Sequence, residues 1–230
     1  MPTTNDKAVV QDYFNTVGFD RWRRIYGDGD VNKVQKDIRI GHQQTVDTVI
    51  SWLKADGDLS GQSFCDAGCG VGSLSIPLAT MGIQVSASDI SKKMVEEAQS
   101  RAQQTLGQDQ NPNFSVQDLE TLSGSFDTVI CLDVLIHYPD QKVPEMINHL
   151  ASLAKSRIIL SFAPWTIGYM LLKKIGSFFP GPSKTTRAYL HRDFDICDIL
   201  RSQGWTIERK AMTKTSFYFS RIIEAKRPDA

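Results

Sequence analysis

Glycine and aspartate residues with the spacing of a nucleotide-binding turn stand in the first third of the chain. Residues 66–72, DAGCGVG, follow a short β-rich run. Small residues at a strand end let a ligand lie against the backbone. Asp89 ends the next β-rich run about twenty residues further on, where a carboxylate can accept hydrogen bonds from both ribose hydroxyls. The spacing therefore predicts a site for a nucleoside-containing cofactor.

A simpler interpretation of these residues is a tight turn followed by a helix-capping aspartate. A third residue weighs against it, because Asp118 follows the next β-rich run, where it can accept from the exocyclic amine of an adenine. A nicotinamide-dependent oxidoreductase would share these features. Its G-x-G-x-x-G pattern, counted from Gly68, requires glycine at position 73. That position is Ser73, so the strict dinucleotide fingerprint fails.

Two further segments carry groups that suit an acceptor substrate. Residues 131–139, CLDVLIHYP, place His137 at the carboxyl edge of the predicted sheet, where ligands bind in open α/β folds. Residues 19–27, FDRWRRIYG, combine aromatic and cationic groups, which suit an anionic, partly flat ligand. The alternatives are a histidine satisfied at a loop or cap and a solvated amphipathic helix. We assign mainly structural roles to the other histidines: His42, His149 and His191.

Alternating strands and helices must position these residues. Short β-rich runs occur at 63–67, 84–88, 114–117, 128–132 and 157–162. Helical periodicity separates or follows them at 91–106, 141–154 and 191–203, with Ser91 as a plausible N-cap. This alternation predicts βαβ units and a parallel sheet. The last two β-rich runs, 206–212 and 217–225, predict an antiparallel hairpin that closes the sheet edge.

The length of 230 residues fits one domain. Apolar residues recur at helical spacing through the first sixty residues, which predicts helices packed in front of the sheet. We therefore expect a Rossmann-like, doubly wound α/β fold with a seven-stranded, mostly parallel sheet. The expected parts are N-terminal helices and an acceptor cap at 1–60, a cofactor-binding core at 61–163, a lid at 164–190, and a C-terminal helix and hairpin at 191–230.

Composition excludes several classes of function. The 26 Lys and Arg balance 26 Asp and Glu, so no basic field favours nucleic acid. The four cysteines form no C-x-x-C pair, and we expect reduced thiols and no zinc site. We expect no signal or transit peptide. Residues 1–14 lack the basic start and apolar core of a secretion signal, and they lack the Arg- and Ser-rich composition of a transit peptide. The most apolar stretch, 162–179, is interrupted by Lys173 and Lys174 and suits a lid or a membrane surface.

Three segments resemble a known family. The residues 66–72 resemble the first motif of class I methyltransferases, which use S-adenosylmethionine, but this motif is generic. More particular are the blocks RWRRIYGDGDVNKVQ and LDVLIHYP. Together with DAGCGVGSLSIPLA they resemble the magnesium-protoporphyrin IX methyltransferases of the chlorophyll pathway, over nearly the whole chain.

This resemblance implies methyl transfer from S-adenosylmethionine to a propionate carboxylate of magnesium protoporphyrin IX, giving the monomethyl ester and S-adenosylhomocysteine. It implies a class I methyltransferase fold with a lid after strand five. The magnesium arrives with the substrate, so no protein-bound metal is expected. Two further contacts are suggested, with the large subunit of magnesium chelatase and with the thylakoid membrane surface. The expected location is the cytoplasm or membrane periphery of a photosynthetic bacterium-like cell.

The resemblance also assigns roles to residues. His137 and Tyr26 are the expected catalytic residues. The expected cofactor-binding residues are Asp66, Ala67, Gly68, Cys69, Gly70, Asp89, Ile90, Met94, Asp118, Leu119 and Leu132. The expected substrate-binding residues are Arg21, Arg24, Lys36, Trp165 and Tyr169. Two alternatives stay open: a methyltransferase for another small molecule, such as a quinone precursor, and a porphyrin-binding escort with a residual cofactor site.

Overall fold

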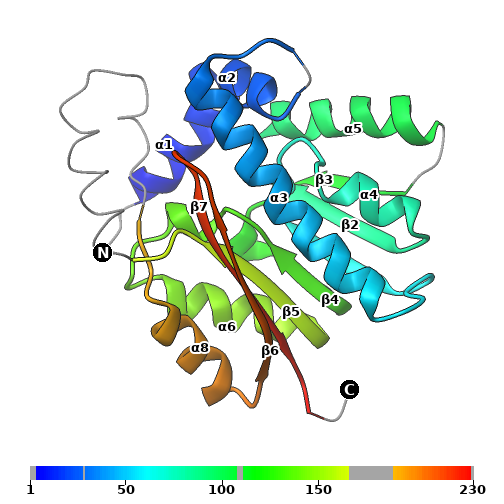
Figure 1. The fold of residues 1–230 in the computed structure, drawn as a ribbon, viewed down its shortest axis with the longest axis vertical. Coiled ribbons are helices and arrows are strands. Elements are labelled where there is room, and N and C mark those ends of the chain that lie inside the picture. The colour runs from blue at the N-terminus through cyan, green and yellow to red at the C-terminus, as the bar shows by residue number, and fades with distance from the viewer. Residues whose placement is uncertain (1–3, 28, 108–110, 166–188, 229–230) are drawn as a thin grey trace.

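The computed structural model describes residues 4–27, 29–107, 111–165 and 189–228. Within these ranges seven strands form one sheet in the order β3-β2-β1-β4-β5-β7-β6 (Figure 1). The strands are β1 (Ser63–Ala67), β2 (Gln84–Asp89), β3 (Asn113–Val116), β4 (Phe126–Cys131), β5 (Ala154–Phe162), β6 (Thr206–Lys214) and β7 (Phe219–Lys226). Strands β1 to β5 pair in parallel, whereas β7 runs antiparallel to β5 and to β6. The predicted doubly wound sheet with its antiparallel C-terminal hairpin is confirmed.

Helices cover both faces of the sheet (Figure 1). On one side lie α3 (Lys33–Ala55), α4 (Ser75–Thr80) and α5 (Lys92–Leu106), and on the other lie α6 (Val143–Leu153) and α8 (Asp193–Ser202). Each side has its own hydrophobic core. Because both faces of the central strands are covered, the last six residues of β5 are all buried.

The helix starts follow local capping chemistry. Asn32 accepts a hydrogen bond from the backbone N–H of Gln35, and the Gln35 side chain accepts one from the backbone N–H of Asn32, which forms a capping box at the start of α3. Ser91 accepts from the N–H of Met94 at 3.3 Å, as expected of the N-cap of α5. These caps fix where α3 and α5 begin, next to the carboxyl ends of the strands.

Two short N-terminal helices, α1 (Thr4–Asn15) and α2 (Val17–Ile25), lie across one end of the sheet (Figure 1). The Gln11 amide donates to the carbonyl of Ile90 at 3.2 Å, and the Ser91 hydroxyl donates to the carbonyl of Phe14 at 3.1 Å. The Arg101 guanidinium donates to the carbonyl of Tyr26 at 2.5 Å. The end of α1 and the end of α2 are therefore held against the start and middle of α5.

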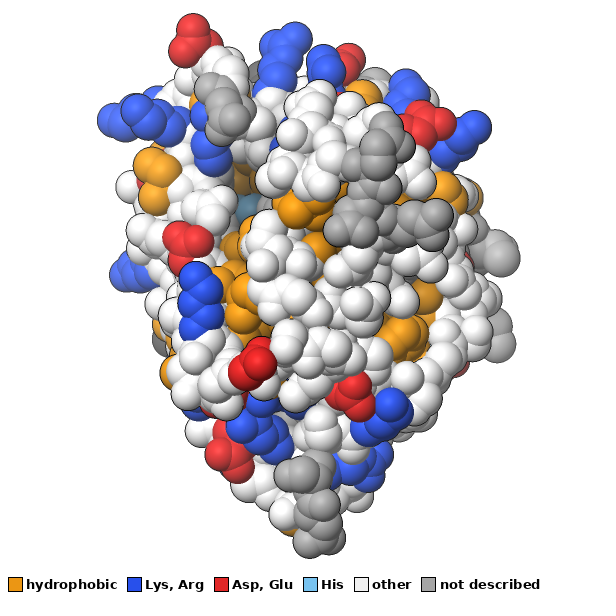
Figure 2. Space-filling model, turned by 90° about the vertical axis from the view of Figure 1, so that its right-hand side faces the viewer, with side chains coloured by type: hydrophobic (Ala, Val, Ile, Leu, Met, Phe, Trp, Pro, Cys, Tyr) orange, Lys and Arg blue, Asp and Glu red, His pale blue; other side chains and the backbone are white. Residues whose placement is uncertain are grey.

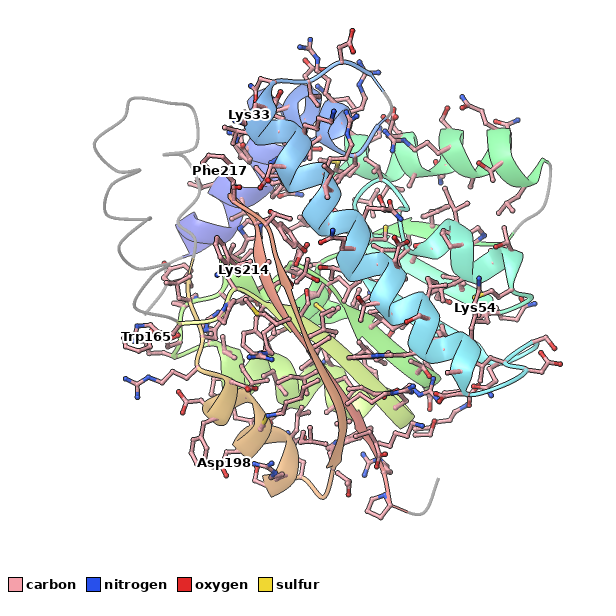
Figure 3. All side chains as sticks on the ribbon, in the orientation of Figure 1. Lys33, Lys54, Trp165, Asp198, Lys214 and Phe217 are labelled. Carbon is pink, nitrogen blue, oxygen red and sulfur yellow. The ribbon has the colours of Figure 1, made fainter. Side chains whose placement is uncertain are left out.

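The tip of the β6–β7 hairpin reaches the start of α3. Asp37 accepts hydrogen bonds from the Thr215 hydroxyl and from the Phe217 N–H, each at 2.6 Å. Figure 3 shows Phe217 at this tip, close to Lys33. The contact brings β7 alongside the helix that carries His42, which matters for the site below.

The predicted lid at 164–190 falls almost wholly outside the described residues, and Tyr169 lies there with it. None of the helices in the described ranges combines the length and the apolar character that crossing a bilayer requires. On the face drawn in Figure 2, acidic and basic side chains are interspersed, so that face has no extended region of a single charge. This distribution agrees with the balanced composition.

Candidate active site

The candidate site lies where the chain order of the sheet reverses. Strands β1 and β4 are neighbours, with β2 and β3 beyond β1 and with β5 beyond β4. In open α/β sheets the crevice at the carboxyl ends of two such strands is the usual ligand site. The glycine loop follows β1, Asp89 ends β2, and Asp133 and His137 follow β4. The sequence-predicted residues therefore share one edge of the sheet.

Asp89 fastens the glycine loop to β2. Its Oδ2 atom accepts from the Gly70 N–H at 3.0 Å, and its Oδ1 atom accepts from the Ser91 N–H at 2.8 Å. The N–H groups of Gly68 and Cys69 donate to the carbonyl of Ser88, at 2.8 and 2.9 Å. Burial raises the pKa of Asp89, although the two backbone donors oppose this shift. Each carboxylate oxygen keeps a further lone pair for a ligand hydroxyl.

The loop leaves room for a ligand on one side only. Gly68 has φ +88°, and a Cβ atom there would lie 2.2 Å from Cγ2 of Val134. Gly70 has φ +52°, and a Cβ atom there would meet no atom of the described structure within 4 Å. The buried hydroxyl of Ser88 has no hydrogen-bond partner among the described residues. Open space over Gly70, next to the Asp89 carboxylate, leaves room for a nucleoside.

Asp66 offers a second buried carboxylate at the end of β1. The Ser75 hydroxyl donates to it. Burial is the largest effect on Asp66, and together with the nearby charge of Asp89 it raises the pKa to about 6, although the Ser75 hydrogen bond acts in the opposite direction. A cationic ligand group would stabilise the ionised form of such a carboxyl. The ammonium of an amino acid is a cationic group of this kind.

The other predicted cofactor residues divide into buried and partly exposed positions. Asp118 is half-buried and accepts from the N–H of Glu120 at 3.0 Å, so it caps the short 3-10 helix η1 (Leu119–Thr121). Ile90 is half-buried beneath α1. The remaining ones are buried: Ala67, Cys69, Met94, Leu119 and Leu132. Their role in binding stays a prediction.

A string of aromatic rings connects the two predicted catalytic residues. Phe14 packs edge-on against His137, with ring centroids 5.5 Å apart, and lies 6.3 Å from Trp22. Trp22 in turn lies 5.4 Å from Tyr26, whose ring lies 4.4 Å from that of His42. The N-terminal helices thus bring Tyr26 into the same group of contacts as His137, although the two residues are far apart in the sequence.

Burial shifts the pKa of both residues toward the neutral form. His137 lies at the end of the 3-10 helix η2 (Leu135–His137), and its Nδ1 atom is buried with no partner among the described residues. Burial lowers the pKa of His137 to about 4, so the ring is neutral at pH 7. Burial, with the charges of Asp133 and Asp89, raises the pKa of Tyr26 well above 10. Its phenol therefore keeps its proton and can donate it in a hydrogen bond.

Asp133 and His42 were not among the predicted site residues. Nδ1 of His42 lies 3.0 Å from Oδ2 of Asp133, which also accepts from the Tyr218 hydroxyl at 2.6 Å. Oδ1 accepts from the hydroxyls of Ser161 and Ser220, at 2.9 and 3.1 Å. The one sequence signal for Asp133 is its place directly after β4. Nothing local marks His42, which stands in the middle of a helix and meets Asp133 only in the folded chain.

The predicted substrate-binding residues that the structure describes come from α2, from α3 and from the end of β5. The Arg21 guanidinium lies 5.9 Å from the ring of Trp22, and its Nε atom is buried without a partner in the described ranges. Arg24 and Lys36 are exposed on α2 and α3. Trp165 follows β5, is 41% exposed, and lies under the guanidinium of Arg192 at 5.2 Å. The basic side chains and Trp165 thus belong to different parts of the surface.

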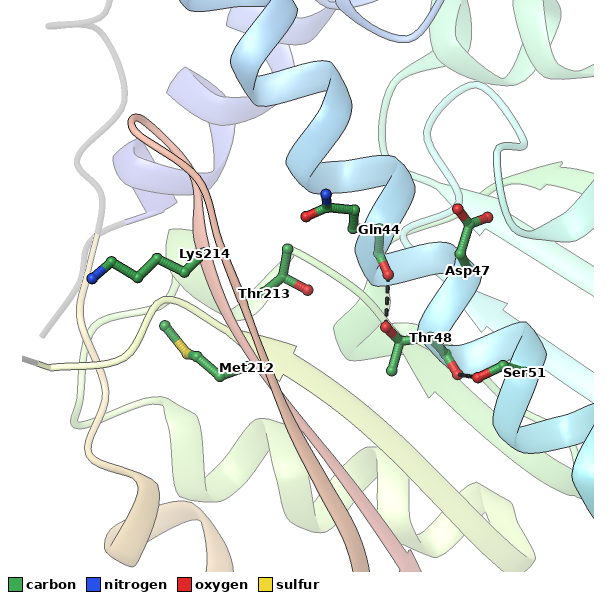
Figure 4. A pocket seen from close by; sticks show the side chains of 7 residues that line it. All are labelled: Gln44, Asp47, Thr48, Ser51, Met212, Thr213 and Lys214. Atoms are coloured by element: carbon green, nitrogen blue, oxygen red, sulfur yellow. Dashed lines mark hydrogen bonds between the residues drawn. The ribbon is translucent and has the colours of Figure 1, made fainter.

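A groove of about 570 Å³ between α3 and β6 is a separate feature (Figure 4). The two hydroxyl groups that α3 contributes bond to their own helix: Thr48 donates to the carbonyl of Gln44 at 2.7 Å, and Ser51 donates to that of Thr48 at 2.8 Å. Asp47 accepts from the Gln43 amide at 2.8 Å. None of the predicted site residues lines this groove, so we do not assign it to the candidate site.

Within the described part of the chain, no group of three or more His, Cys, Asp or Glu side chains is placed to hold a metal ion. The predicted structural role of His191 is consistent with its contacts, because its two ring nitrogens lie 2.9 Å from an Asp140 carboxylate oxygen and 2.9 Å from the carbonyl of Leu135. All four cysteines are buried and unpaired by disulfides.

Two family models match the chain. The model described as magnesium-protoporphyrin IX methyltransferase C-terminus matches residues 131–227, and a methyltransferase domain model matches residues 64–157. The first range contains the loop with His137 and the second contains the glycine loop and Asp89. The match to the methyltransferase domain agrees with the class I fold expected from the sequence.

Relatives of known name cover nearly the whole chain. A magnesium-protoporphyrin O-methyltransferase from Synechocystis is 65% identical over 97% of both chains. The chloroplastic magnesium protoporphyrin IX methyltransferase of Arabidopsis thaliana is 58% identical over 96% of this chain and 71% of its own. A crystal structure of the Synechocystis enzyme with bound SAH superposes with a TM-score of 0.90 at 63% identity, covering 96% of this chain and 99% of that chain. On this evidence the chain belongs to the magnesium-protoporphyrin IX methyltransferase family.

Proposed function

We propose that this chain transfers the methyl group of S-adenosylmethionine to a propionate carboxylate of magnesium protoporphyrin IX, giving the monomethyl ester and S-adenosylhomocysteine in chlorophyll biosynthesis. The observation that carries the proposal is 65% identity, over 97% of both chains, to the Synechocystis magnesium-protoporphyrin O-methyltransferase. The site supports it, because the glycine loop tied to Asp89 and the loop with His137 share one edge of the sheet.

The residues at the ends of β1, β2 and β3 fit the cofactor. S-adenosylmethionine, when bound, supplies an electrophilic methyl group on a sulfonium. Asp66 would hold the ammonium of its methionine part, and Asp89 would accept from its ribose hydroxyls with the lone pairs that Gly70 and Ser91 leave free. Asp118 would accept from the adenine amine. The open space over Gly70 gives the cofactor access to the backbone of the loop.

The acceptor needs placement more than activation. A propionic acid has a pKa near that of Glu, about 4.3, so it is ionised at neutral pH without a strong base. Holding the carboxylate in line with the departing sulfur, away from water, can account for several kcal/mol of the barrier. The neutral ring of His137 and the protonated phenol of Tyr26 suit this task, since each can donate a hydrogen bond to the carboxylate. In this scheme both residues orient the acceptor.

The porphyrin-binding residues stay proposals. One of the basic residues Arg21, Arg24 and Lys36 would hold the second, unreactive propionate, and Trp165 with Tyr169 would cover the flat ring. The division of the chain into an N-terminal cap at 1–60, a core at 61–163, a lid at 164–190 and a C-terminal part at 191–230 belongs to the same scheme. It is supported by the position of α1 and α2 across the end of the sheet.

We further propose contacts with the large subunit of magnesium chelatase and with the thylakoid surface, and a location in the cytoplasm or at the membrane periphery of a photosynthetic bacterium-like cell. The support is the family resemblance and the occurrence of relatives in Synechocystis and in a plant chloroplast. Co-sedimentation with thylakoid vesicles, and co-elution with the chelatase subunit, would test these contacts separately.

The function is tested by incubating the chain with labelled S-adenosylmethionine and one acceptor at a time. Label in the monomethyl ester of magnesium protoporphyrin IX is the expected result. A phenolic quinone precursor is the informative alternative, because ubiquinone biosynthesis O-methyltransferases are also similar, at 31% identity over 66% of this chain. Label in the quinone precursor alone would contradict the proposal. Porphyrin binding without transfer would indicate an escort.

A further inference from the structure

Asp133 holds an unusual backbone conformation directly after β4. Its φ is +58°, and it is the one non-glycine residue with positive φ in the described ranges. Such a conformation is uncommon for residues with a side chain and is best tolerated by Asn and Asp. It persists where surrounding contacts impose it, and such positions cluster at functional sites. The contacts of the Asp133 side chain supply that constraint.

Four elements converge on this carboxylate. His42 comes from α3, Ser161 from β5, Ser220 from β7, and Tyr218 from the turn before β7. The partners are 28 to 91 residues away in sequence. Burial would raise the pKa of Asp133, but the hydrogen bonds from these donors outweigh it, and the pKa lies below its usual value. The carboxylate therefore stays ionised and keeps all its donors oriented.

Helix α3 packs closely against Tyr218, one of the hydrogen-bond donors to Asp133. A Cβ atom on Gly41 would lie 2.3 Å from Cδ1 of the Tyr218 ring, so only glycine fits beside it. The Tyr218 hydroxyl, whose proton goes to Asp133, also lies 3.0 Å from the Thr45 hydroxyl, which in turn lies 3.0 Å from the hydroxyl of Thr213 on β6. These contacts fix α3 against the β6–β7 hairpin at positions close to His42 in the helix.

His42 connects the carboxylate to Tyr26. One ring nitrogen bonds to Asp133, and the ring itself lies against Tyr26 with centroids 4.4 Å apart and an interplanar angle of 43°. Two arginines complete the placement of Tyr26 through its backbone: Arg101 donates to the carbonyl of Tyr26, and Arg39 donates to that of Ile25 at 2.9 Å. The Tyr26 ring thus contacts the His42 ring on one side and the Trp22 ring on another, and the His42 ring is hydrogen-bonded to Asp133.

We propose that Asp133 and His42 are positioning residues for methyl transfer, in which Asp133 fixes the His42 ring and the His42 ring fixes the Tyr26 side chain that faces the acceptor. This inference rests on the proposed function for its catalytic consequence. It concerns neither cofactor binding nor the chemistry of the methyl group. It predicts that loss of either residue lowers kcat while the affinity for S-adenosylmethionine stays as in the wild type.

Three variants test the chain of contacts. Asp133→Asn keeps the size and the tolerance for positive φ but removes the charge and one acceptor atom. His42→Asn keeps a donor near the position of Nδ1 and removes the ring from Tyr26. Asp127→Asn is the matched control: Asp127 stands at the opposite end of β4 and accepts hydrogen bonds from Ser63 and Lys155, away from the candidate site. Thermal unfolding establishes that each variant is folded.

Two measurements separate positioning from a purely structural role. We expect Asp133→Asn and His42→Asn to lower kcat on the order of 10- to 100-fold, with the Kd for S-adenosylmethionine changed less than about twofold, and Asp127→Asn to leave both unchanged. The NMR signal of the labelled Tyr26 ring, assigned with Tyr26→Phe, should shift in the first two variants and not in the control.

Wild-type kcat in the folded His42→Asn variant, or an unshifted Tyr26 signal, would overturn the positioning role. A wild-type chain that does not methylate the porphyrin would overturn the proposed function instead. In that case the Tyr26 signal still decides whether Asp133 and His42 hold the ring. The two proposals can therefore fail separately.

Discussion

A Cβ atom added to Gly68 would lie 2.2 Å from Cγ2 of Val134, so the glycine loop after β1 and the loop after β4 pack against each other without space for a side chain. Gly68 also has φ +88°, which disfavours any L side chain. We expect Gly68→Ala to lower the free energy of unfolding by more than the about 1–3 kcal/mol that backbone strain accounts for. Urea unfolding measures this loss.

Gly57→Ala is the control for Gly68→Ala, because Gly57 has φ +97° but nothing within 4 Å of the added Cβ atom. Gly57→Ala should lower the free energy of unfolding only by the cost of the backbone strain. Equal losses in the two variants would mean that the loops adjust freely to a side chain, contrary to the close packing inferred here.

Gly70→Ala should affect ligand binding more than folding. The added Cβ atom meets no protein atom within 4 Å, so the cost to the free protein is the backbone strain at φ +52°. In the proposed site the methyl group occupies space used by S-adenosylmethionine. Calorimetry should therefore find the Kd for S-adenosylmethionine raised roughly tenfold or more, equivalent to about 1.4 kcal/mol. An unchanged Kd would mean that S-adenosylmethionine does not bind against this loop.

The affinity for S-adenosylmethionine should depend on pH through Asp66. Burial raises the pKa of this carboxyl to about 6, so it is mostly ionised at pH 7.5 and mostly protonated at pH 5. In the proposed site the ammonium of the cofactor would bind the ionised form of Asp66, so the affinity should fall as the pH is lowered through 6. Asp66→Asn should bind more weakly at pH 7.5 and lose most of this dependence. If Asp66→Asn kept the pH dependence of the affinity, a titrating group other than Asp66 would be responsible for it.

His137 should make stability depend on pH with a defined sign. Its pKa is lowered from 6.5 in the unfolded chain to about 4 in the folded protein. Between these values the unfolded state binds the proton and the folded state does not. The stabilising contribution of the neutral ring is thus fully present above pH 6.5 and is lost as the pH falls toward 4, by up to about 1.4 kcal/mol per pH unit.

The measurement for this prediction is the free energy of unfolding of the wild type minus that of His137→Asn, taken at several pH values. Other titrating groups largely cancel in the difference. The difference should decline from pH 7 to pH 4. A constant difference would show that the ring is solvated in the folded chain.

Much of the fold could be predicted from the sequence because its signals are local. The β-rich runs, the helical periodicities and the Ser91 cap each depend on neighbouring residues, and the alternation of strands and helices predicts parallel pairing. The glycine loop and Asp89 are found in the same way, since spacing along the chain places them at adjacent strand ends.

The Asp133 network could not be predicted, because its partners meet only when distant elements pack. His42 is 91 residues from Asp133, and Tyr218 is 85 residues from it. A histidine in the middle of a helix carries no local sign of its partner. The low pKa of His137 depends in the same way on burial by the N-terminal helices, which no spacing in the sequence encodes.

In the proposed methyl transfer Asp89 holds the cofactor and His137 orients the acceptor carboxylate. The most direct measurement is transfer from labelled S-adenosylmethionine to magnesium protoporphyrin IX by the wild type and by Asp89→Ala and His137→Ala. We expect the wild type to form the ester and both variants to form much less of it. The affinity for S-adenosylmethionine should be lost only in Asp89→Ala. A wild type that binds S-adenosylmethionine but leaves the porphyrin unmethylated would contradict it.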